Sequence, residues 1–527
     1  MEQSYLNANN SDLLIISNPL YITEDVSECG YCKGNKENVS NYFSLDSSYQ
    51  KHYQNGKLDI DISNCTLGLY VELTSIEIYD KFCNLGFRRS GRYLYKPDLL
   101  RNCCKLYTIR TSLEQCKFTK DLKTTMKRFK KFTGTTKYLN DNNLNNTNQQ
   151  FDLVKEAYVI DKYSPDFYTR FETCHYTTEK FELFKKYQKV IHNDVNVDPQ
   201  MFEKFLCLTP FSKDVVNGDK DEWDTLNNLT NLYEIKYLKE KKTLDYNIKI
   251  RQVPAHECYY QDNKLIAISV LDFLPSGVSS VYFIWDPDYP KWALGKVSAL
   301  RELAMVDLLG LDYYYMGYYI EDCPKMNYKE KYGGELLDVC NNQYVPIKTV
   351  KEFIKNGKFF TLGNVQDNKD IDENDEYYNK VELPLNDKIN IDLQKPVVNI
   401  AEMLFGSKAN SINYVNMIVD KLRKYGINYP NNLKNDYFPR RNQIVNHNIY
   451  SMPDIVPGIL PLWQILQIIE SNDINRLNNK LMIYYSDEKI MKVVKNVMDE
   501  DVSTKKCIIN IIRLIGLELT ANALIVM

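Results

Sequence analysis

The chain contains 527 residues, of which 44% are hydrophobic and 26% are charged, and its net charge is −3. This composition predicts a globular protein with two or more domains, and it argues against a protein that is basic throughout. The N-terminus shows no basic segment followed by an apolar one, so we expect no secretory signal. The apolar stretch 455–469 is interrupted by Pro457 and Pro461, which argues against a membrane span.

Thirteen cysteines are present, and four of them form two close pairs. Cys29 and Cys32 form a CxxC motif, and Cys103 and Cys104 are adjacent. Without a secretory signal, such cysteines favour reduced thiols or a metal site over a disulfide framework. Four thiolates are what a tetrahedral zinc ion or an iron–sulfur cluster needs, while buried free thiols and a redox-active CxxC are the alternatives.

The segment 81–131 is strongly basic, with fifteen Lys and Arg residues against three acidic residues, a net charge of +12. Such a segment attracts phosphates, although a solvated charged face is the simpler interpretation. We favour a polyanionic partner. We therefore expect a Cys-rich, basic N-terminal domain over residues 1–133, followed by an Asn-rich linker or loop over 134–150.

A strand–turn–strand–loop–helix–strand pattern occupies the centre of the chain. Runs rich in β-branched and aromatic residues at 264–271, 279–285 and 313–320 predict strands, and apolar spacing over 300–308 predicts a helix. The last three elements form a βαβ unit, so the loop 286–295 would lie at the carboxyl end of a parallel strand, where ligands bind. An ordinary tight strand-to-helix connection is the alternative.

Around this centre we expect a catalytic domain over residues 151–363, with helices at 179–190, 201–206 and 332–338. Residues 364–394 are acidic and rich in Asn, which predicts a flexible segment. Helical patterns at 459–471 and 504–515 predict a helical C-terminal region over 395–527. The fold class is therefore α/β (α+β), a mixed sheet with flanking helices.

Several sequence blocks together resemble the eukaryotic arginyl-tRNA–protein transferases, and most closely the yeast type. They are CGYCKGN at 29–35, GFRRSGRYLYKPDLLRNCCKLYTIR at 86–110, FYTRFE at 167–172, HECYY at 256–260, LPSGVSSVYFIWDPDYPKW and LG across 274–295, YYYMGYYIEDCPKMNYK at 313–329 and VPGILPLW at 456–463. The blocks cover the first 350 or so residues densely. Their length and order make the resemblance specific.

The resemblance implies an enzyme that transfers arginine from arginyl-tRNA to the N-terminal α-amine of proteins that begin with Asp, Glu or oxidised Cys. This reaction would mark those proteins for ubiquitin-dependent degradation, in the cytoplasm and also in the nucleus. The resemblance further implies an N-acetyltransferase-like (GNAT-like) catalytic fold. It implies an iron–sulfur cluster or zinc at Cys29, Cys32, Cys103 and Cys104, and no nucleotide cofactor.

Candidate roles follow from motif membership and from position along the strands. An acidic acceptor side chain needs a cation, for which we expect Arg170 first, then His256 and Lys325. The arginine of the donor needs an acid, for which Asp272 and Asp286 are the candidates, and hydroxyls for the reacting groups would come from Ser279, Tyr282 and Tyr319. We expect the acceptor arm of tRNA to contact the basic residues Arg88, Arg89, Arg92, Lys105 and Arg110.

Two other functions compete with the transferase. A metal-containing RNA-binding protein without catalysis would use the same basic segment, but it would not need the ordered family blocks. A GNAT-type N-acetyltransferase normally carries an Arg/Gln-x-x-Gly-x-Gly/Ala turn for the pyrophosphate of acetyl-CoA. Here that place holds Asp288 through Gly295, which lacks most of the turn and argues against CoA.

Overall fold

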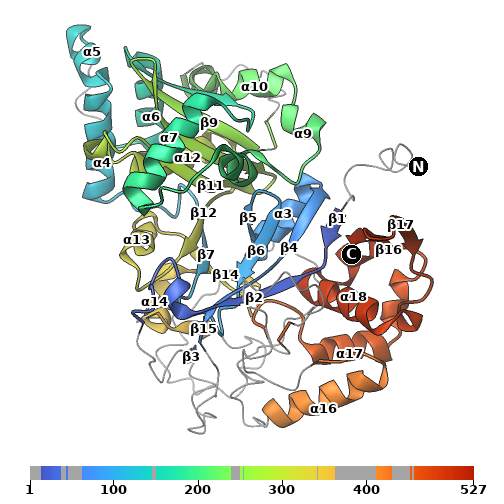
Figure 1. Ribbon diagram of the computed structural model, residues 1–527. Helices are drawn as coiled ribbons and strands as arrows, with labels where there is room; N and C mark the ends of the chain where they lie inside the picture. Colours follow the sequence, from blue (N-terminus) through green and yellow to red (C-terminus); the bar gives the residue numbers. More distant parts are fainter. Residues whose placement is uncertain are drawn as a thin grey trace.

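The computed structural model describes residues 14–36, 43–45, 62–144, 150–238, 250–252, 254–340, 342–355, 357–361, 411–429, 452–453 and 456–527. The predicted flexible segment 364–394 lies outside these residues. Within the described part, the chain folds into a mixed α/β structure with two eight-stranded mixed sheets and one small two-stranded sheet (Figure 1). None of its described helices is long and apolar enough to cross a membrane.

The central sheet has the strand order β14-β13-β7-β12-β11-β10-β9-β8. Among the described strands of this sheet, β11 and β12 run parallel and the other neighbouring pairs are antiparallel. The strands are β7 (Tyr107–Thr111), β8 (Phe167–Glu172), β9 (Pro254–Gln261), β10 (Lys264–Leu274), β11 (Gly277–Trp285), β12 (Tyr313–Tyr319), β13 (Glu335–Asp338) and β14 (Gln343–Pro346). The three predicted strands are thus β10, β11 and β12.

Helices cover both faces of this sheet. Helix α12 (Leu294–Leu309) connects β11 to β12, which confirms the predicted βαβ unit, and almost its whole surface is buried. It packs against β11 and β12 on one side and against α4 (Lys120–Phe132) and α6 (Leu153–Tyr163) on the other. The opposite face carries α3 (Ile76–Asn84) and α7 (Thr178–Tyr187), because alternate residues of a strand point to opposite faces.

The second sheet joins the two ends of the chain. Its order is β17-β16-β18-β1-β4-β6-β5, and β2 also pairs with β4. Its strands are β1 (Leu14–Ser17), β2 (Leu20–Glu24), β4 (Asn64–Thr74), β5 (Arg88–Ser90), β6 (Tyr93–Pro97), β16 (Met482–Tyr485), β17 (Ile490–Val493) and β18 (Ala523–Val526). The C-terminal elements, coloured red, lie beside β1 (Figure 1).

The remaining elements are short or peripheral. The small sheet pairs β3 (Phe43–Leu45) with β15 (Phe359–Thr361). The other helices are η2 (Val26–Glu28), α5 (Thr135–Asp141), η3 (Gln188–His192), α8 (Pro199–Phe202), η4 (Glu203–Cys207), α9 (Lys213–Asn217), α10 (Lys220–Leu226), α11 (Leu229–Tyr233), η5 (Glu234–Leu238), η6 (Pro290–Trp292), α13 (Pro324–Asn327), η7 (Tyr328–Tyr332), α14 (Ile347–Ile354), α16 (Ser411–Lys424), α17 (Leu462–Glu470), η12 (Asp473–Leu477), η13 (Val497–Asp499), α18 (Val502–Ile515) and α19 (Leu517–Ala521).

Three local expectations differ from the structure. Residues 135–141 of the expected linker form helix α5. The expected helix at 332–338 is instead the end of η7 and strand β13, because Gly333 and Gly334 both have positive φ angles that a helix cannot accommodate. The C-terminal region contains its predicted helices, and it also contributes three strands to the second sheet.

Candidate active site and metal centre

The parallel strand pair of the central sheet, β11 and β12, separates part-way along its length. β11 and β12 are paired over Gly277 to Ser279 and Tyr313 to Tyr315, after which β12 pairs with β7 alone. A register shift between Tyr315 and Tyr318 accompanies this change, and Gly317 has a φ of +71° there. We call the diverging ends, residues 280–285 and 316–320, the fork. Its position at the carboxyl ends of parallel strands is where α/β folds bind ligands.

One side of the fork presents a tyrosine and a histidine. The hydroxyl of Tyr282 accepts a hydrogen bond from Gln188 Nε2 at 3.3 Å and lies 3.4 Å from His192 Nε2. His192 ends the π-helix η3, and its ring packs edge-on against Tyr187 with ring centres 5.4 Å apart. Burial raises the pKa of Tyr282, so its hydroxyl stays protonated near neutral pH.

The other side of the fork is formed by α13 and η7, which follow β12. Lys325 is exposed on α13. Desolvation of the His192 ring, followed by the charge of Lys325, lowers the pKa of His192, so this imidazole is neutral at pH 7. Tyr282 and Lys325, both predicted from the sequence, are therefore linked through His192, which Tyr282 contacts and whose pKa the charge of Lys325 lowers. His192 was missed, and its only sequence signal is that the chain has just five histidines.

A buried carboxylate lies on the α12 side of the fork. Glu302 is fully buried and accepts hydrogen bonds from Ser269 at 2.5 Å, Ser298 at 2.7 Å and Tyr314 at 2.6 Å. Burial raises the pKa of Glu302 even though these hydroxyls oppose the shift. Because Ser269 is on β10, Tyr314 on β12 and Glu302 on α12, this cluster ties together the elements that border the fork. No sequence pattern had indicated this cluster.

Asp272 and Ser279 point to the α3 face and are both buried. Asp272 forms a bidentate ion pair with Arg89, with both N–O distances at 2.7 Å, and it also accepts a hydrogen bond from Tyr79 at 3.0 Å. Both side chains of this ion pair have no exposed surface. Asp272 therefore serves in this structure as the internal partner of Arg89, and it is closed to a substrate arginine.

Asp286 and Tyr319 also have partners within the protein. Asp286 follows β11 and accepts hydrogen bonds from Lys186 at 2.5 Å and Lys264 at 2.7 Å. Although burial opposes ionisation, these two lysines hold the pKa of Asp286 below its usual value. The hydroxyl of Tyr319 donates to Glu321 and to Glu330, and burial followed by these carboxylates raises its pKa. Asp286 directly follows the β11 end of the fork and Tyr319 belongs to its β12 end, and both side chains are engaged by partners within the protein.

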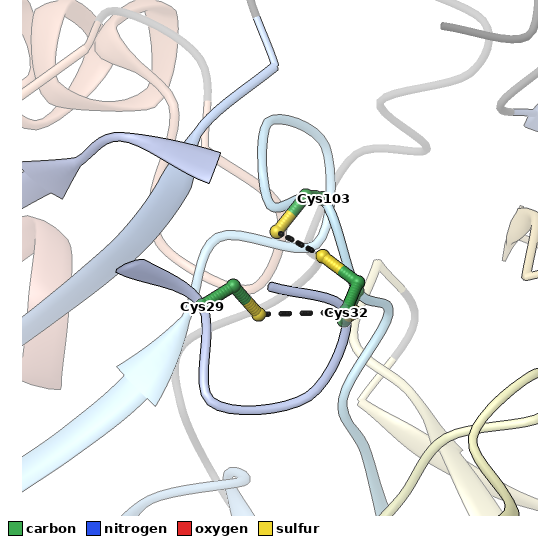
Figure 2. Close-up of side chains that lie close together, drawn as sticks. Cys29, Cys32 and Cys103 are labelled. Atoms are coloured by element: carbon green, nitrogen blue, oxygen red, sulfur yellow. Dashed lines mark hydrogen bonds between the residues drawn. The ribbon is translucent and has the colours of Figure 1, made fainter. Parts of the chain in front are cut away.

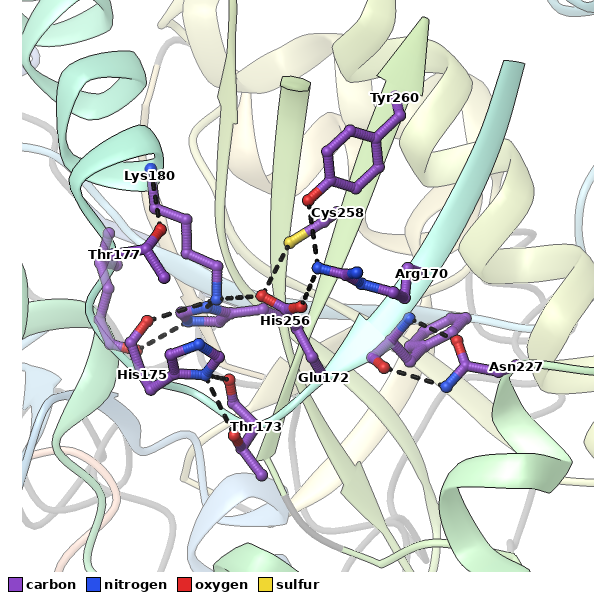
Figure 3. Close-up of polar contacts among 12 residues, drawn as sticks. Arg170, Glu172, Thr173, His175, Thr177, Lys180, Asn227, His256, Cys258 and Tyr260 are labelled. Carbon is purple, nitrogen blue, oxygen red and sulfur yellow. Dashed lines mark hydrogen bonds and ion pairs between the residues drawn. The ribbon is translucent and has the colours of Figure 1, made fainter. Parts of the chain in front are cut away.

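Arg170 and His256 belong to a separate polar cluster at the sheet edge (Figure 3). His256 is fully buried between Lys180 Nζ at 3.0 Å and the carbonyl of Leu206 at 3.1 Å. Burial, then Lys180, lowers its pKa to about 3, so the ring is neutral and has a packing role. Arg170 is exposed on the edge strand β8, where it pairs with Glu172 at 2.7 Å. Because β9 and β10 separate β8 from β11, the structure does not bring Arg170 to the fork.

The four paired cysteines converge as expected. The sulfur atoms of Cys29, Cys32, Cys103 and Cys104 all lie within 4.8 Å of one another. Figure 2 shows the first three of these side chains, with their sulfurs turned toward one another. The Cys29–Cys104 and Cys32–Cys103 separations are 3.8 Å and 3.7 Å. A tetrahedral ion with metal–sulfur bonds of about 2.3 Å places its sulfurs about 3.8 Å apart. The donor set therefore fits a metal, and no disulfide forms among the described cysteines.

Comparison with known proteins assigns the chain to a family. The models described as "Arginine-tRNA-protein transferase, N terminus" and "Arginine-tRNA-protein transferase, C terminus" match residues 27–124 and 179–338. Arginyl-tRNA--protein transferase 1 of Saccharomyces cerevisiae is 40% identical over 98% of this chain and 99% of the yeast protein. The chain belongs to the arginyl-tRNA–protein transferase family. It is therefore an enzyme of the aminoacyltransferase class.

Two further relatives match shorter parts of this transferase at lower identity. Arginyl-tRNA--protein transferase 2 of Arabidopsis thaliana is 32% identical over 36% of this chain and 29% of its own length. The aspartate/glutamate leucyltransferase of Pseudomonas fluorescens is 26% identical over 49% of this chain and 78% of its own length. The two family-model matches contain the four cysteines and the fork, whereas Arg170 lies between them.

Four of the five basic residues that we expected on a tRNA-binding surface of this transferase are buried. Arg88, Arg89, Lys105 and Arg110 are each at most 6% exposed. Arg89 pairs with Asp272 and Arg110 with Glu335, while Arg88 and Lys105 donate to backbone carbonyls. Their charged groups are enclosed by the protein and do not reach the phosphates on the surface of a bound tRNA, so this expectation is corrected for all four. Arg92 has a 42% exposed side chain and pairs with Glu72.

The exposed positive charge of the same segment lies on α4 instead. Its apolar residues Leu122, Met126 and Phe129 face inward, and Phe129 contacts Trp292 in the loop after β11. Asp121, near the start of α4, binds both Lys296 and Lys331. The outward face of α4 is thus basic and adjoins the loop that leads from the fork into α12. Its exposed cations are Lys120, Lys127, Arg128 and Lys131.

Proposed function

We propose that this transferase moves arginine from arginyl-tRNA to the N-terminal α-amine of proteins that begin with Asp, Glu or oxidised Cys. The observation that carries the proposal is the fork, whose neutral His192, protonated Tyr282 and exposed Lys325 lie together within the matched C-terminal family range. Proteins modified in this way would enter ubiquitin-dependent degradation, in the cytoplasm and in the nucleus.

The chemistry requires no ATP, because the ester that links arginine to tRNA is already activated. The acceptor amine, with a reference pKa of about 7.7–8.0, attacks the ester carbonyl in its neutral form. A C–N bond forms, the C–O bond to the ribose breaks, and the amine proton passes to a base while the ribose oxygen gains a proton. His192 is suited to accept the amine proton, and the Tyr282 hydroxyl is suited to donate to the oxyanion.

The basic face of α4 is the proposed contact for the phosphates of the tRNA acceptor arm. It combines exposed cations with a position against Trp292 and Lys296 at the start of α12. A tRNA bound there has its backbone next to the fork, so a short 3′ end can reach the reacting groups. Phosphate contacts of this kind give binding that weakens steeply with salt.

Acidic acceptor specificity has support in a relative's name. The bacterial relative is called an aspartate/glutamate leucyltransferase, and its match covers 49% of this chain. If the two enzymes use a related acceptor site while their donors differ, that site recognises a carboxylate. Within this chain, such recognition calls for cations close to the fork.

Zinc or an iron–sulfur cluster is the proposed occupant of the four-cysteine site. Both accept four thiolates, and the sulfur separations of 3.7 Å and 3.8 Å favour a single tetrahedral ion such as zinc. Bound metal would supply folding free energy by cross-linking the CxxC turn to the loop before β7. All four ligands come from protein residues, so the proposed role is structural.

The direct test uses purified protein, radiolabelled arginyl-tRNA and two peptides that differ only in an N-terminal Asp or Ala. We expect label on the Asp peptide alone, without ATP. Tight binding of tRNA with no transfer, in protein with full metal content, would contradict the proposal and favour a non-catalytic RNA-binding protein. Acetyl transfer from acetyl-CoA without RNA would instead favour the N-acetyltransferase.

A further inference from the structure

A buried arginine beside β12 has N–H groups that make no hydrogen bond with any described residue. Arg88 is 6% exposed, and its Nη1 donates to the carbonyls of Cys83 and Phe87 at 2.9 and 2.6 Å. Its Nε and Nη2 are buried and make no hydrogen bond with any described residue. The guanidinium lies against the rings of Tyr315 and Tyr318, 5.7 and 5.8 Å from their centres. Ring contacts offset only part of the cost of burying a charge.

A lysine lies close to this arginine. Lys329 Nζ donates to the carbonyl of Tyr318 at 2.6 Å. Burial, followed by the charge of Arg88, lowers the pKa of Lys329 to about 7. In the described part of the chain, neither cation forms an ion pair with a carboxylate, and the strongest electrostatic neighbours of Arg88 are Cys83 and tyrosines. Two partly desolvated cations thus lie together without a counter-ion.

The pair borders the bulge of β12 that opens the fork. A Cβ atom added at Gly317 would have Lys329 Nζ at 4.0 Å as its nearest neighbour, so the backbone at this point is not packed against other side chains. Tyr315 is the last residue of β12 that pairs with β11, and Tyr318 is the first to pair with β7 beyond the bulge. Lys325, on the same side of the fork, lies four residues before Lys329.

We propose that Arg88 and Lys329 form the acceptor-specificity site of this transferase and bind the side-chain carboxylate of an N-terminal Asp or Glu. The inference rests on the proposed function and replaces Arg170 and His256, which the structure places elsewhere. A carboxylate offers acceptor oxygens to the unused donors of Arg88 and to Lys329. An anion bound there also favours protonated Lys329, so acceptor binding and the charge of Lys329 support each other.

The test measures transfer to two peptides that differ only in N-terminal Asp or Asn, which have the same shape but not the same charge. In Lys329→Met we expect kcat/KM for the Asp peptide to fall about 10- to 100-fold, mainly through KM, because a hydrogen bond to a charged group is lost. Transfer to the Asn peptide and KM for arginyl-tRNA should not change. Lys329→Arg, which keeps the charge, should restore part of the preference for Asp.

Lys96→Met is the matched control. Lys96 is buried, whereas Lys329 is half-buried, but burial lowers the pKa of both lysines to about 7. Lys96 also donates to backbone carbonyls, and these belong to Leu85 and Gly458. We expect this variant to keep the wild-type ratio of Asp to Asn transfer. If Lys329→Met keeps that ratio too, the inference is wrong while the proposed function stands. If wild-type protein does not transfer to the Asp peptide, the proposed function itself fails.

Discussion

Replacing Asp272 should damage stability rather than chemistry. Arg89 donates to both carboxylate oxygens of Asp272 at 2.7 Å, and Tyr79 adds a third hydrogen bond at 3.0 Å. Neither side chain of the ion pair has exposed surface. The substitution Asp272→Leu removes the only carboxylate that pairs with Arg89 among the described residues. Burial lowers the pKa of Arg89 and Asp272 raises it, and without Asp272 the unfavourable effect of burial remains. Because an arginine does not lose its proton in a protein, the variant leaves a charged guanidinium in the interior without a partner carboxylate.

The expected magnitude follows from burial. Breaking a fully buried ion pair costs about 3–5 kcal/mol of unfolding free energy, because the remaining charge is uncompensated. This is a large part of the roughly 5–15 kcal/mol that holds a typical domain folded. With a shift of about 2–4 °C per kcal/mol for a domain of 150–250 residues, we expect the melting temperature to fall by roughly 6–20 °C. The double variant Asp272→Leu with Arg89→Met removes both charges and should recover much of this loss.

The assay compares thermal unfolding with single-turnover transfer at low temperature, where the variant is still folded. We expect the single variant to melt early but to transfer arginine at near the wild-type rate per folded molecule. A variant that melts like the wild type but has lost transfer would refute this reasoning. It would restore the role that the sequence suggested, in which Asp272 binds the arginine of the donor.

The other predictions concern the metal, tRNA and proton transfer. The Cys32→Ser variant should contain no bound metal when measured by mass spectrometry. The Cys65→Ser variant, which changes a buried cysteine outside the cluster, should retain the metal. Changing Lys127, Arg128 and Lys131 to Glu should weaken tRNA binding and reduce the slope of log affinity against log salt by up to about 3, and the same charge change at Lys421, Arg423 and Lys424 on α16 should not. His192→Gln should slow transfer and change its pH profile. In a plot of log kcat/KM against pH, the wild type should lose activity with slope one below the pKa of the acceptor amine. Below the lowered pKa of His192, which lies under 6.5, the slope should become two because both bases are then protonated. The variant lacks the imidazole and should keep slope one throughout.

Local sequence patterns predicted the βαβ unit because its signals are contiguous. Strand periodicity, the Pro275-Ser276-Gly277 turn and the apolar face of α12 all lie within one short stretch. The place of β7 in the central sheet was not predictable in the same way. Its sequence, YTIRT, predicts a strand at most, and its partner β12 follows some 200 residues later. Local sequence patterns indicate whether a segment is a helix or a strand, whereas the order of strands in a sheet depends on contacts between distant segments.

The basic segment shows the same limit at the level of side chains. A charge count treats Arg89 and Arg110 as available to phosphate, but their partners Asp272 and Glu335 are 183 and 225 residues away in sequence. The cysteine pairs were predictable because thiols at such spacings have few other uses. Tyr282 and Lys325 were predicted as separate residues. His192, the residue that brings them into one arrangement, lies in a π-helix without a sequence signature of its own.

The metal centre and the fork are connected through the strands. Cys29, Cys103 and Cys104 pack in one cluster with Ile320, which directly follows β12, and with Cys323, which directly precedes α13 and its Lys325. Cys104 also lies just before β7, the strand that holds the outer half of β12 away from β11. Metal bound at the cysteines would thus fix both the strand that opens the fork and the turn that carries its cations. The segment after β12, which carries Lys325 and Lys329, packs against the cysteine cluster. Partial loss of metal should therefore raise KM for the acceptor peptide before it unfolds the enzyme.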